Sequence, residues 1–253
     1  TDIEGKTTTV EINFSKQPPY TSTLEGESFY MPFDGDYRDQ IGFENATQVG
    51  SPGFASSGYA GIGAYKGVPD SYLTFPSGDL LSDEFSAAFW YKVDANADRA
   101  GILVVGDNAD DRNQGFRLFR EGDANEQRIK LNVGTGAGDS WNDGGVLDVT
   151  AGEWVHVAFT ISQTQSIIYF NGNMVNTADL SAPIDWTGAE SITIGSGGET
   201  FSYWNHLSDG SAMDELRFFD KALSQTDIQI MLNSFNPYIP QYDGESFYMP
   251  FEG

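Results

Sequence analysis

Residues 26–33 read GESFYMPF, and residues 244–251 repeat these eight letters without a change. The second copy begins 218 positions after the first (residue 244 against residue 26). Short solenoid repeats recur every 20 to 50 residues or so, whereas one all-β domain has about the length seen here. The repeated octapeptide therefore predicts one whole domain followed by the opening strand of another.

The repeat also predicts where the parts of the chain begin and end. Residues 21–236 are expected to form one domain, and residues 237–253 a linker and the first strand of a following repeat. Val10, Ile12 and Phe14 alternate with polar residues, which is typical of a half-buried strand. Residues 1–20 are therefore expected to be the last strand of a preceding domain with its linker.

The composition favours an all-β fold with two packed sheets. The chain has 253 residues, 29 glycines and 14% aromatic residues, which suits large side chains between sheets and glycines in turns. Short apolar runs separated by Gly, Asn, Asp and Pro predict strands at 71–75, 85–93, 101–105, 115–119, 128–133, 154–161, 166–170 and 191–194.

Two local patterns predict particular structures. Asn171 and Gly172 separate two apolar runs, and both residues accept the positive φ of a two-residue hairpin turn. Ser224 and Asp227 form a capping box at the start of a short apolar stretch that Pro237 ends. We expect one hairpin at the first pattern and one short C-terminal helix at the second.

The formal charge of −24 excludes some partners. A surface this acidic repels phosphate backbones and anionic lipid head groups, so we expect neither nucleic-acid binding nor binding to a membrane surface. No stretch is apolar enough to span a bilayer, so no membrane insertion by this segment is expected. Two interpretations of the acidity stay open: a solubilising surface on a secreted or salt-tolerant protein, or carboxylates that also hold Ca²⁺.

Four segments follow one another along the chain: FYMPFDG at 29–35, DEFSAAFWYKV at 83–93, GEWVHVAFT at 152–160 with IYFNG at 168–172, and MDELRFF at 213–219 with ALS at 222–224. In this order they make the chain resemble the laminin-G-like (concanavalin A-like) jelly-roll domains of bacterial surface and secreted proteins. The resemblance covers about residues 28–232 and implies a two-sheet antiparallel jelly-roll sandwich. This fold hosts lectins, hydrolases, lyases and spacers, so it does not define a function.

The resemblance also implies a structural Ca²⁺ between the first and last strands. Asp34 and Asp214 match the family positions for its ligands, and Asp36 and Asp39 are additional carboxylates nearby. Ca²⁺ prefers oxygen ligands of this kind. The alternative is that Asp34 and Asp36 only shape a turn around Gly35.

The acidic pairs of the sequence do not predict an enzyme. Residues i and i+2 of a strand share a face, and a glycosidase needs two facing carboxyl groups. The pairs at 25/27, 34/36 and 121/123 have that spacing, but each straddles a glycine in an expected turn. The chain has no cysteine, and its two histidines share no short spacing; His156 matches a structural family position. We expect no catalysis, with a hydrolase or lyase as the less favoured alternative.

Aromatic residues outside the expected strands are the candidate ligand contacts. A sugar ring presents C–H groups that pack on an indole or phenol face, while polar neighbours bond its hydroxyls. Trp90 and Trp154 lie in apolar strands and are expected in the core. The candidate contacts are Trp141, Trp186, Tyr203 and Trp204 on expected loops, His206 in an exposed loop, and Arg112, Asn113 and Arg117 as hydrogen-bond donors or acceptors. The alternative is that these tryptophans cap a sandwich edge.

These observations together predict a non-catalytic extracellular or cell-surface module that binds a polysaccharide or surface glycan, with other surface proteins as further possible partners. A structural or adhesive spacer is the alternative function. The second octapeptide has one alternative role as well, since it could pair with the sheet of another chain and join molecules head to tail.

Overall fold

The computed structural model describes residues 20–93, 99–106, 112–122, 127–147, 152–198, 200–201 and 204–235. The strand expected at 7–14 and the repeated strand at 247–251 lie outside these residues. The chain divides into two compact units, and the unit Ser22–Pro237 contains every element described below.

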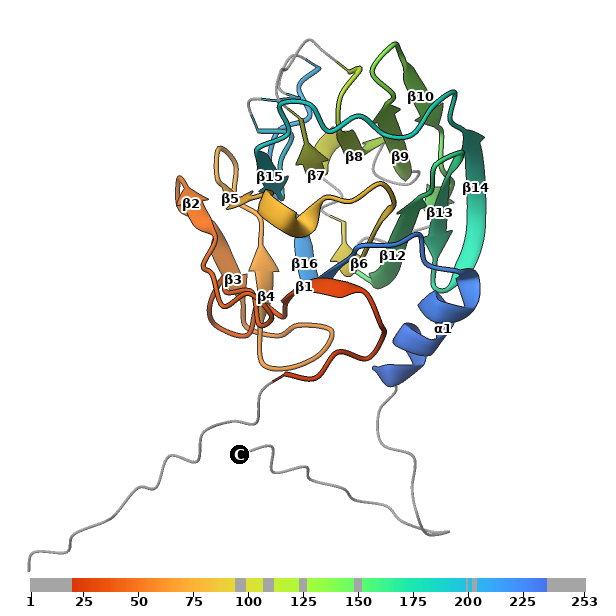
Figure 1. Cartoon of the computed structure of the whole chain (residues 1–253). Helices are drawn as coiled ribbons and strands as arrows, with labels where there is room; N and C mark the ends of the chain where they lie inside the picture. The colour runs from red at the N-terminus through yellow and green to blue at the C-terminus, as the bar shows by residue number, and fades with distance from the viewer. Residues whose placement is uncertain are drawn as a thin grey trace, which may run out of the picture. The chain divides into compact units, whose positions relative to one another are not determined.

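Two antiparallel sheets form the domain (Figure 1), as the sequence predicts. The first sheet has the order β14-β13-β12-β6-β16-β4-β3, with β1 also paired to β16. Its strands are β1 (Glu27–Met31), β3 (Gly53–Ala55), β4 (Ala64–Lys66), β6 (Phe85–Lys92), β12 (Trp154–Ile161), β13 (Gln165–Phe170), β14 (Asn173–Asp179) and β16 (Ala212–Phe219).

The second sheet has the order β10-β9-β8-β7-β15-β5-β2, with β11 also paired to β9. Its strands are β2 (Thr47–Val49), β5 (Tyr72–Pro76), β7 (Arg99–Val105), β8 (Phe116–Gly122), β9 (Gln127–Gly134), β10 (Asp139–Asn142), β11 (Val146–Leu147) and β15 (Ser191–Ile194). A short 3₁₀ turn, η1 (Gly78–Leu80), follows β5.

Aromatic side chains fill the space between the sheets. Phe29 of β1 stacks on Phe218 of β16, with ring centroids 4.4 Å apart, and meets Phe75 of the second sheet edge-on at 5.0 Å. All three side chains are buried. Contacts of this kind bury large apolar areas and join the two sheets into one core.

The predicted hairpin is confirmed between β13 and β14. Asn171 has φ 48° and Gly172 has φ 77°, which are the positive values that a type I′ turn requires. β14 is a sheet edge, and its residues are largely exposed.

The predicted helix is also confirmed as α1 (Gln225–Ser234), which lies at the lower right of Figure 1. Ile228 and Met231 are buried and pack against Ala158 and Tyr169 on the outer face of the first sheet. No helix within the described ranges is long and apolar enough to cross a membrane.

Trp90 and Trp154 are not in the core between the sheets, contrary to the expectation. Trp90 is buried, but it lies on the outer face of the first sheet, where Tyr59 stacks on it. Trp154 is only half-buried, and the Lys92 ammonium lies 5.1 Å from its ring. The apolar residues beside Trp90 and Trp154 in their strands do not reveal which face of the sheet each indole is on, nor whether another element covers the outer face.

The capping box gives a first prediction, because the Ser224 hydroxyl accepts from the Asp227 N–H and the Asp227 carboxylate accepts from the Ser224 N–H at 2.9 Å. Ser224→Ala leaves a helix N–H unpaired and is expected to lower the free energy of unfolding by about 1 kcal/mol in urea denaturation. Thr226→Ala, at an exposed position of the same turn, is the control. Equal losses for the two variants would contradict the role of the cap.

Candidate functional site

The outer face of the second sheet is covered by a long segment of chain. Phe116 and Leu118 of β8 point into the core, whereas Phe119 packs outward with Val104 and Phe201. Phe201 belongs to the segment between β15 and β16, which therefore folds back over the sheet. This covered face brings together most of the residues that the sequence predicts as ligand contacts.

His206 anchors the covering segment. Its ring lies parallel to Phe201, with centroids 4.5 Å apart, and its Nε2 is 3.0 Å from Glu121 Oε1. The His206 carbonyl accepts hydrogen bonds from Gly101 and Gly197. His206 is fully buried, so the prediction of an exposed histidine is wrong: its polar neighbours in sequence do not reveal that the segment folds onto an aromatic surface.

Trp141 and Trp204 form a stacked pair beside this anchor. Their ring centroids are 5.7 Å apart and their planes differ by 14°. The Arg112 guanidinium lies 5.5 Å from the Trp141 ring and 5.3 Å from the Trp204 ring, within cation–π range. Trp204 is 37% exposed, so an indole held by its neighbours still presents surface to solvent.

Polar groups border the tryptophan pair. Asp139 lies two residues before Trp141 on β10; its Oδ2 accepts a hydrogen bond from Asn132 at 2.8 Å and lies 3.8 Å from Arg112 Nε. Arg117 Nη1 lies 3.4 Å from Asn132 Oδ1. Asn132 and Arg117 are fully buried, so the partly exposed polar groups beside the aromatic surface are Arg112 and Asp139. An aromatic surface with a few polar groups beside it is the usual composition of a small-ligand site.

The electrostatics of the anchor follow from burial and from three neighbouring charges. Burial lowers the pKa of His206 to about 4, although Glu121 opposes this shift. Burial favours the protonated form of Glu121, but hydrogen bonding to Lys130 together with the charges of Lys130 and His206 outweighs it, so the pKa of Glu121 is lowered. Lys130 Nζ is 3.1 Å from Glu121 Oε2. At neutral pH, His206 is therefore neutral and Glu121 is charged.

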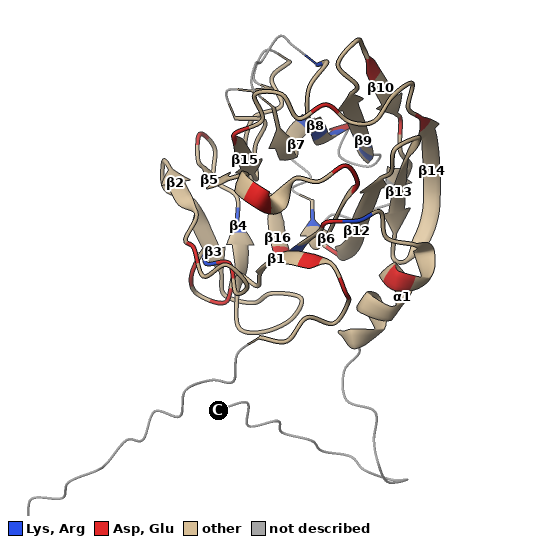
Figure 2. Cartoon of the chain, in the orientation of Figure 1, with Lys and Arg blue, Asp and Glu red and all other residues tan. Residues whose placement is uncertain are grey.

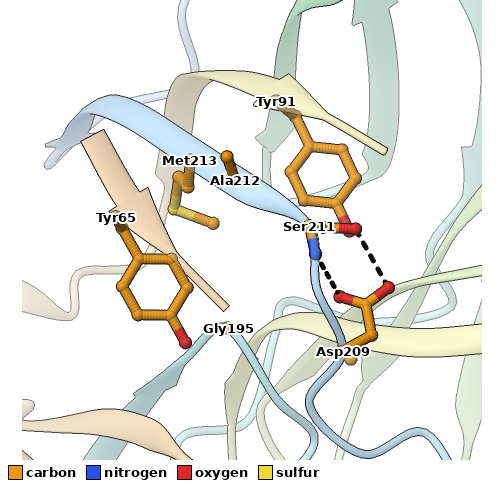
Figure 3. A pocket seen from close by; sticks show the side chains of 8 residues that line it. Tyr65, Tyr91, Gly195, Asp209, Ser211, Ala212 and Met213 are labelled. Atoms are coloured by element: carbon orange, nitrogen blue, oxygen red, sulfur yellow. Dashed lines mark hydrogen bonds between the residues drawn. The ribbon is translucent and has the colours of Figure 1, made fainter. Parts of the chain in front are cut away.

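A buried ion pair holds the end of the covering segment. Arg120 of β8 contacts the Asp209 carboxylate, and both side chains are buried. Figure 3 shows Asp209 accepting from the N–H and the hydroxyl of Ser211, each at 2.9 Å. Asp209 and Ser211 line a small cavity together with Tyr65 and Tyr91, and this cavity has room for about one water molecule. The cavity is therefore part of the anchor and too small for a sugar.

The structure places Trp186 away from the Trp141–Trp204 pair, in contact with the core between the sheets. Trp141 is on strand β10, whereas a loop was expected. Trp186 is half-buried against Phe85, and its Nε1 donates to Ser82 O at 2.9 Å. It therefore caps an edge of the sandwich, which is the alternative role stated for these tryptophans. The Asn113 carbonyl accepts from Gly136. Tyr203 lies outside the described residues.

Some residues of the site were not found from the sequence. Phe119, Phe201, Glu121 and Asp139 contribute to the tryptophan pair or its anchor. Asp139 could have been found, because residues two apart on a strand share a face. Phe201 could not, because its partner Phe119 is 82 positions earlier in the chain (residue 201 against residue 119).

Asp34 and Asp214 meet at one glycine-rich loop, residues 58–63. Asp34 Oδ1 accepts the N–H groups of Ile62 at 2.6 Å and Gly63 at 3.1 Å. Asp214 Oδ2 accepts those of Tyr59 at 2.7 Å and Ala60 at 3.0 Å. The two carboxylates therefore hold the loop from both ends.

The surroundings of Asp214 favour its neutral form. Burial, together with the nearby Glu215 and Asp34 carboxylates, raises its pKa to about 7, against the opposing effect of the Ala60 and Tyr59 N–H groups. In the part of the chain that the structure describes, no three acidic or histidine side chains gather in a way that would hold a metal ion. Asp36 is exposed and its Oδ1 accepts from the Arg38 N–H at 3.2 Å, a turn contact. The calcium expectation stays a prediction.

The comparisons with known proteins agree with this architecture. The family model described as the concanavalin A-like lectin/glucanases superfamily matches residues 66–229, more than half of the chain. The chain belongs to this family. No curated protein is similar enough in sequence to count as a relative.

Solved structures with low sequence identity share the fold. Domain 4 of AbnA, an extracellular arabinanase from Geobacillus stearothermophilus solved with arabinotriose, is 19% identical with a TM-score of 0.61, over 80% of this chain and 96% of that one. The binding domain of botulinum neurotoxin DC, solved with SialylT, is 15% identical with a TM-score of 0.62, over 85% of this chain. This chain spans 53% of that toxin domain.

The buried histidine of the anchor predicts a pH dependence. A histidine whose folded pKa is about 4 and whose unfolded pKa is near 6.5 destabilises the fold as the pH falls below 6.5. Between pH 7 and pH 5 this one group is expected to lower the free energy of unfolding by about 2 kcal/mol. Urea denaturation of wild type and His206→Gln at both pH values measures it. The same pH dependence in both proteins would contradict the assignment.

Proposed function

We propose that the domain is a non-catalytic carbohydrate-binding module whose contact surface is the Trp141–Trp204 pair with Arg112. The observation that carries the proposal is the 37% exposure of Trp204 within a stack that fixes its orientation. An indole without a ligand gains stability by becoming fully buried. Here the stack, the cation and the His206 anchor hold it partly in solvent.

The surface has the chemistry that a sugar requires. The C–H groups of a pyranose or furanose ring pack on an indole face, and the polar groups of Asp139 and Arg112 are placed to bond hydroxyls. Because Trp204 already contacts both Trp141 and Arg112, binding orders little further structure. Such preorganisation lowers the entropic cost of association.

Two similar folds support the choice of ligand class. The AbnA domain was solved with arabinotriose and the toxin domain with SialylT. Those ligands belong to those proteins, and the low identities transfer the fold alone. For this chain, a polysaccharide or surface glycan is the proposed partner because of its own aromatic pair.

The setting we propose is extracellular or on the cell surface. The net charge of −24 disfavours nucleic acid and anionic lipid as ligands. Figure 2 shows acidic residues spread over turns and element ends, whereas several of the few cations lie on β8 and β9. If the repeated octapeptide does open a second module, linked weak sites gain avidity on one polymer through effective concentration.

Replacing the exposed indole gives the test of this function. Trp204→Ala is expected to weaken binding by about tenfold or more to a polysaccharide that slows the wild-type protein in affinity electrophoresis, because the stacking face is lost. Affinity electrophoresis against a panel of neutral and acidic polysaccharides, followed by tryptophan fluorescence titration, measures the change. Trp154→Phe, on the first sheet, is the matched control and should bind as wild type does.

The alternatives give different results in the same panel. No retardation by any glycan would overturn the proposal and favour the spacer function. New reducing ends or unsaturated products in the incubated polysaccharide would show catalysis instead. Equal losses in Trp204→Ala and Trp154→Phe would place the binding surface elsewhere.

We propose further that Ca²⁺ braces the loop at residues 58–63. A methyl group added at Gly58 would overlap the carbonyl oxygens of Gly63 and Ala60 and the Asp214 carboxylate, so three oxygens converge there. Oxygen ligands from carboxylates and backbone carbonyls suit Ca²⁺, and Asp34 holds the other end of the same loop. A bound cation would offset both the burial of the Asp214 charge and its repulsion by Glu215 and Asp34, which together raise the pKa of Asp214.

Calcium binding is tested by thermal unfolding. Ca²⁺ near 100 times its dissociation constant is expected to raise the Tm by about 5 °C or more, because a ligand that binds only the folded state stabilises it. Asp34→Asn should abolish the shift, and Asp79→Asn, an exposed carboxylate in η1, should keep it. The same Tm in calcium and in EGTA would contradict the brace.

A further inference from the structure

One cation and one carboxylate border the Trp141–Trp204 pair, and the cation lies at the side of the stack. The Arg112 guanidinium is about equally far from the two ring centres, 5.5 Å from Trp141 and 5.3 Å from Trp204. The ring centres are 5.7 Å apart. A guanidinium packed on the outer face of Trp204 would lie much farther from Trp141 than from Trp204. Arg112 is therefore placed beside a sugar ring that packs on the exposed part of Trp204.

Arg112 and Asp139 both keep capacity for hydrogen bonds. Their side chains are 35% and 22% exposed, and Arg112 Nε lies 3.8 Å from Asp139 Oδ2, which is longer than a hydrogen bond. Among the residues that the structure describes, the Asp139 carboxylate accepts one hydrogen bond, from Asn132, and the Arg112 guanidinium donates none. A guanidinium has five N–H donors and a carboxylate about four acceptor sites, so most of both remain for a ligand.

A donor beside an acceptor suits two adjacent hydroxyl groups of one sugar ring. Each hydroxyl can donate one hydrogen bond and accept others. One hydroxyl can therefore donate to the Asp139 carboxylate while its neighbour accepts from the Arg112 guanidinium. Both hydrogen bonds are charge-assisted, which makes them stronger than those between neutral groups. An ionised carboxylate or sulfate on a sugar only accepts, so it cannot supply the donor that Asp139 needs.

Three other partly exposed cations lie on strands of this sheet, and each has partners within the protein. They are Lys130, 3.1 Å from Glu121 and 3.7 Å from Asp143; Arg99, which donates to the Trp204 carbonyl; and Arg128, which donates to the Asp143 carbonyl. An anionic sugar would have to compete with these partners, and the net charge of −24 repels it as it approaches. A neutral sugar meets neither obstacle.

We propose that the Arg112–Asp139 pair makes this site selective for neutral glycans by recognising two adjacent hydroxyls of the ring that packs on Trp204. The inference rests on the proposed function, because it names the class of sugar bound at the same surface. Trp204 supplies the stacking surface and the charged pair supplies the selection. Asp139 accepts from one hydroxyl and repels carboxylates and sulfates, while Arg112 donates to the next hydroxyl.

The selection by charge is tested with the 253-residue chain on immobilised polysaccharides, both neutral (arabinan, galactomannan, xyloglucan) and acidic (polygalacturonate, alginate, chondroitin sulfate). Wild type is expected to bind at least one neutral polymer about ten times more tightly than any acidic one. Asp139→Asn keeps an acceptor oxygen but removes the charge. It should raise the affinity for polygalacturonate about tenfold, because Arg112 can then pair with a sugar carboxylate.

Asp143→Asn is the matched control for this charge change. Asp143 follows the same strand, β10, and is 71% exposed beside Lys130. Its replacement removes the same charge from the chain but leaves the Arg112–Asp139 pair in place. The ratio of neutral to acidic affinity should therefore stay as in wild type. An equal change of this ratio in Asp139→Asn and Asp143→Asn would contradict the role of Asp139, because net charge alone would explain it.

The recognition of hydroxyls is tested with a partly O-methylated form of the neutral polysaccharide that binds best. A methyl ether keeps the ring and its C–H groups but cannot donate a hydrogen bond. Methylation should weaken binding to wild type about tenfold and binding to Asp139→Ala less than about threefold, because this variant has no carboxylate to satisfy. Thermal unfolding confirms that Asp139→Ala is folded. Equal losses on methylation in the two proteins would overturn the recognition of hydroxyls by Asp139.

Failure of this inference and failure of the proposed function give different results. Binding to acidic polysaccharides in preference to neutral ones, lost in Trp204→Ala, would overturn the neutral class and leave the binding surface in place. Binding to none of the six polysaccharides would overturn the proposed function, and this inference with it.

Discussion

The burial of β16 on both faces is the constraint on which the rest of the domain depends. All eight of its residues are buried. Its inner face contributes Phe218 to the core, so its outer face must hide Asp214 and Arg217. A buried charge is tolerated only with partners in good geometry. Those partners come from β1 and from the loop at 58–63, so the charges of one central strand determine how two other segments are attached.

The two sheets cover their outer faces differently. On the first sheet, α1 buries Ile228 and Met231 over small and aromatic residues, and Tyr59 completes the cover by stacking on Trp90. On the second sheet, an irregular segment does this with Phe201 and buried His206. An irregular segment needs partners for its backbone groups. Trp204 lies on this segment, stacked on Trp141 and partly exposed, and this is why the candidate site lies on the second sheet.

The acidity of the chain and its candidate ligand site are compatible because they occupy different places. Two carboxylates in the interior are paired with arginines, Asp209 with Arg120 and Glu215 with Arg217, whereas buried Asp214 and Asp39 accept backbone N–H groups. Most of the others lie on turns and element ends, where water solvates them (Figure 2). A neutral sugar loses little by approaching such a surface, whereas a polyanion is repelled. The tryptophan pair can therefore contribute binding energy while the surrounding charge restricts the class of ligand.

The sequence by itself determined the fold class, many of the longer strands, the Asn171–Gly172 turn and the capped helix, because each depends on neighbouring residues. It also named Trp141, Trp204 and Arg112, although it could not show that they meet. Only the tertiary structure decided that His206 is buried, that Trp186 caps the sandwich and that Asp34 and Asp214 hold one loop. The physical reason is the range of the interactions: turns and caps act within a few residues, whereas burial depends on which distant segment covers a face.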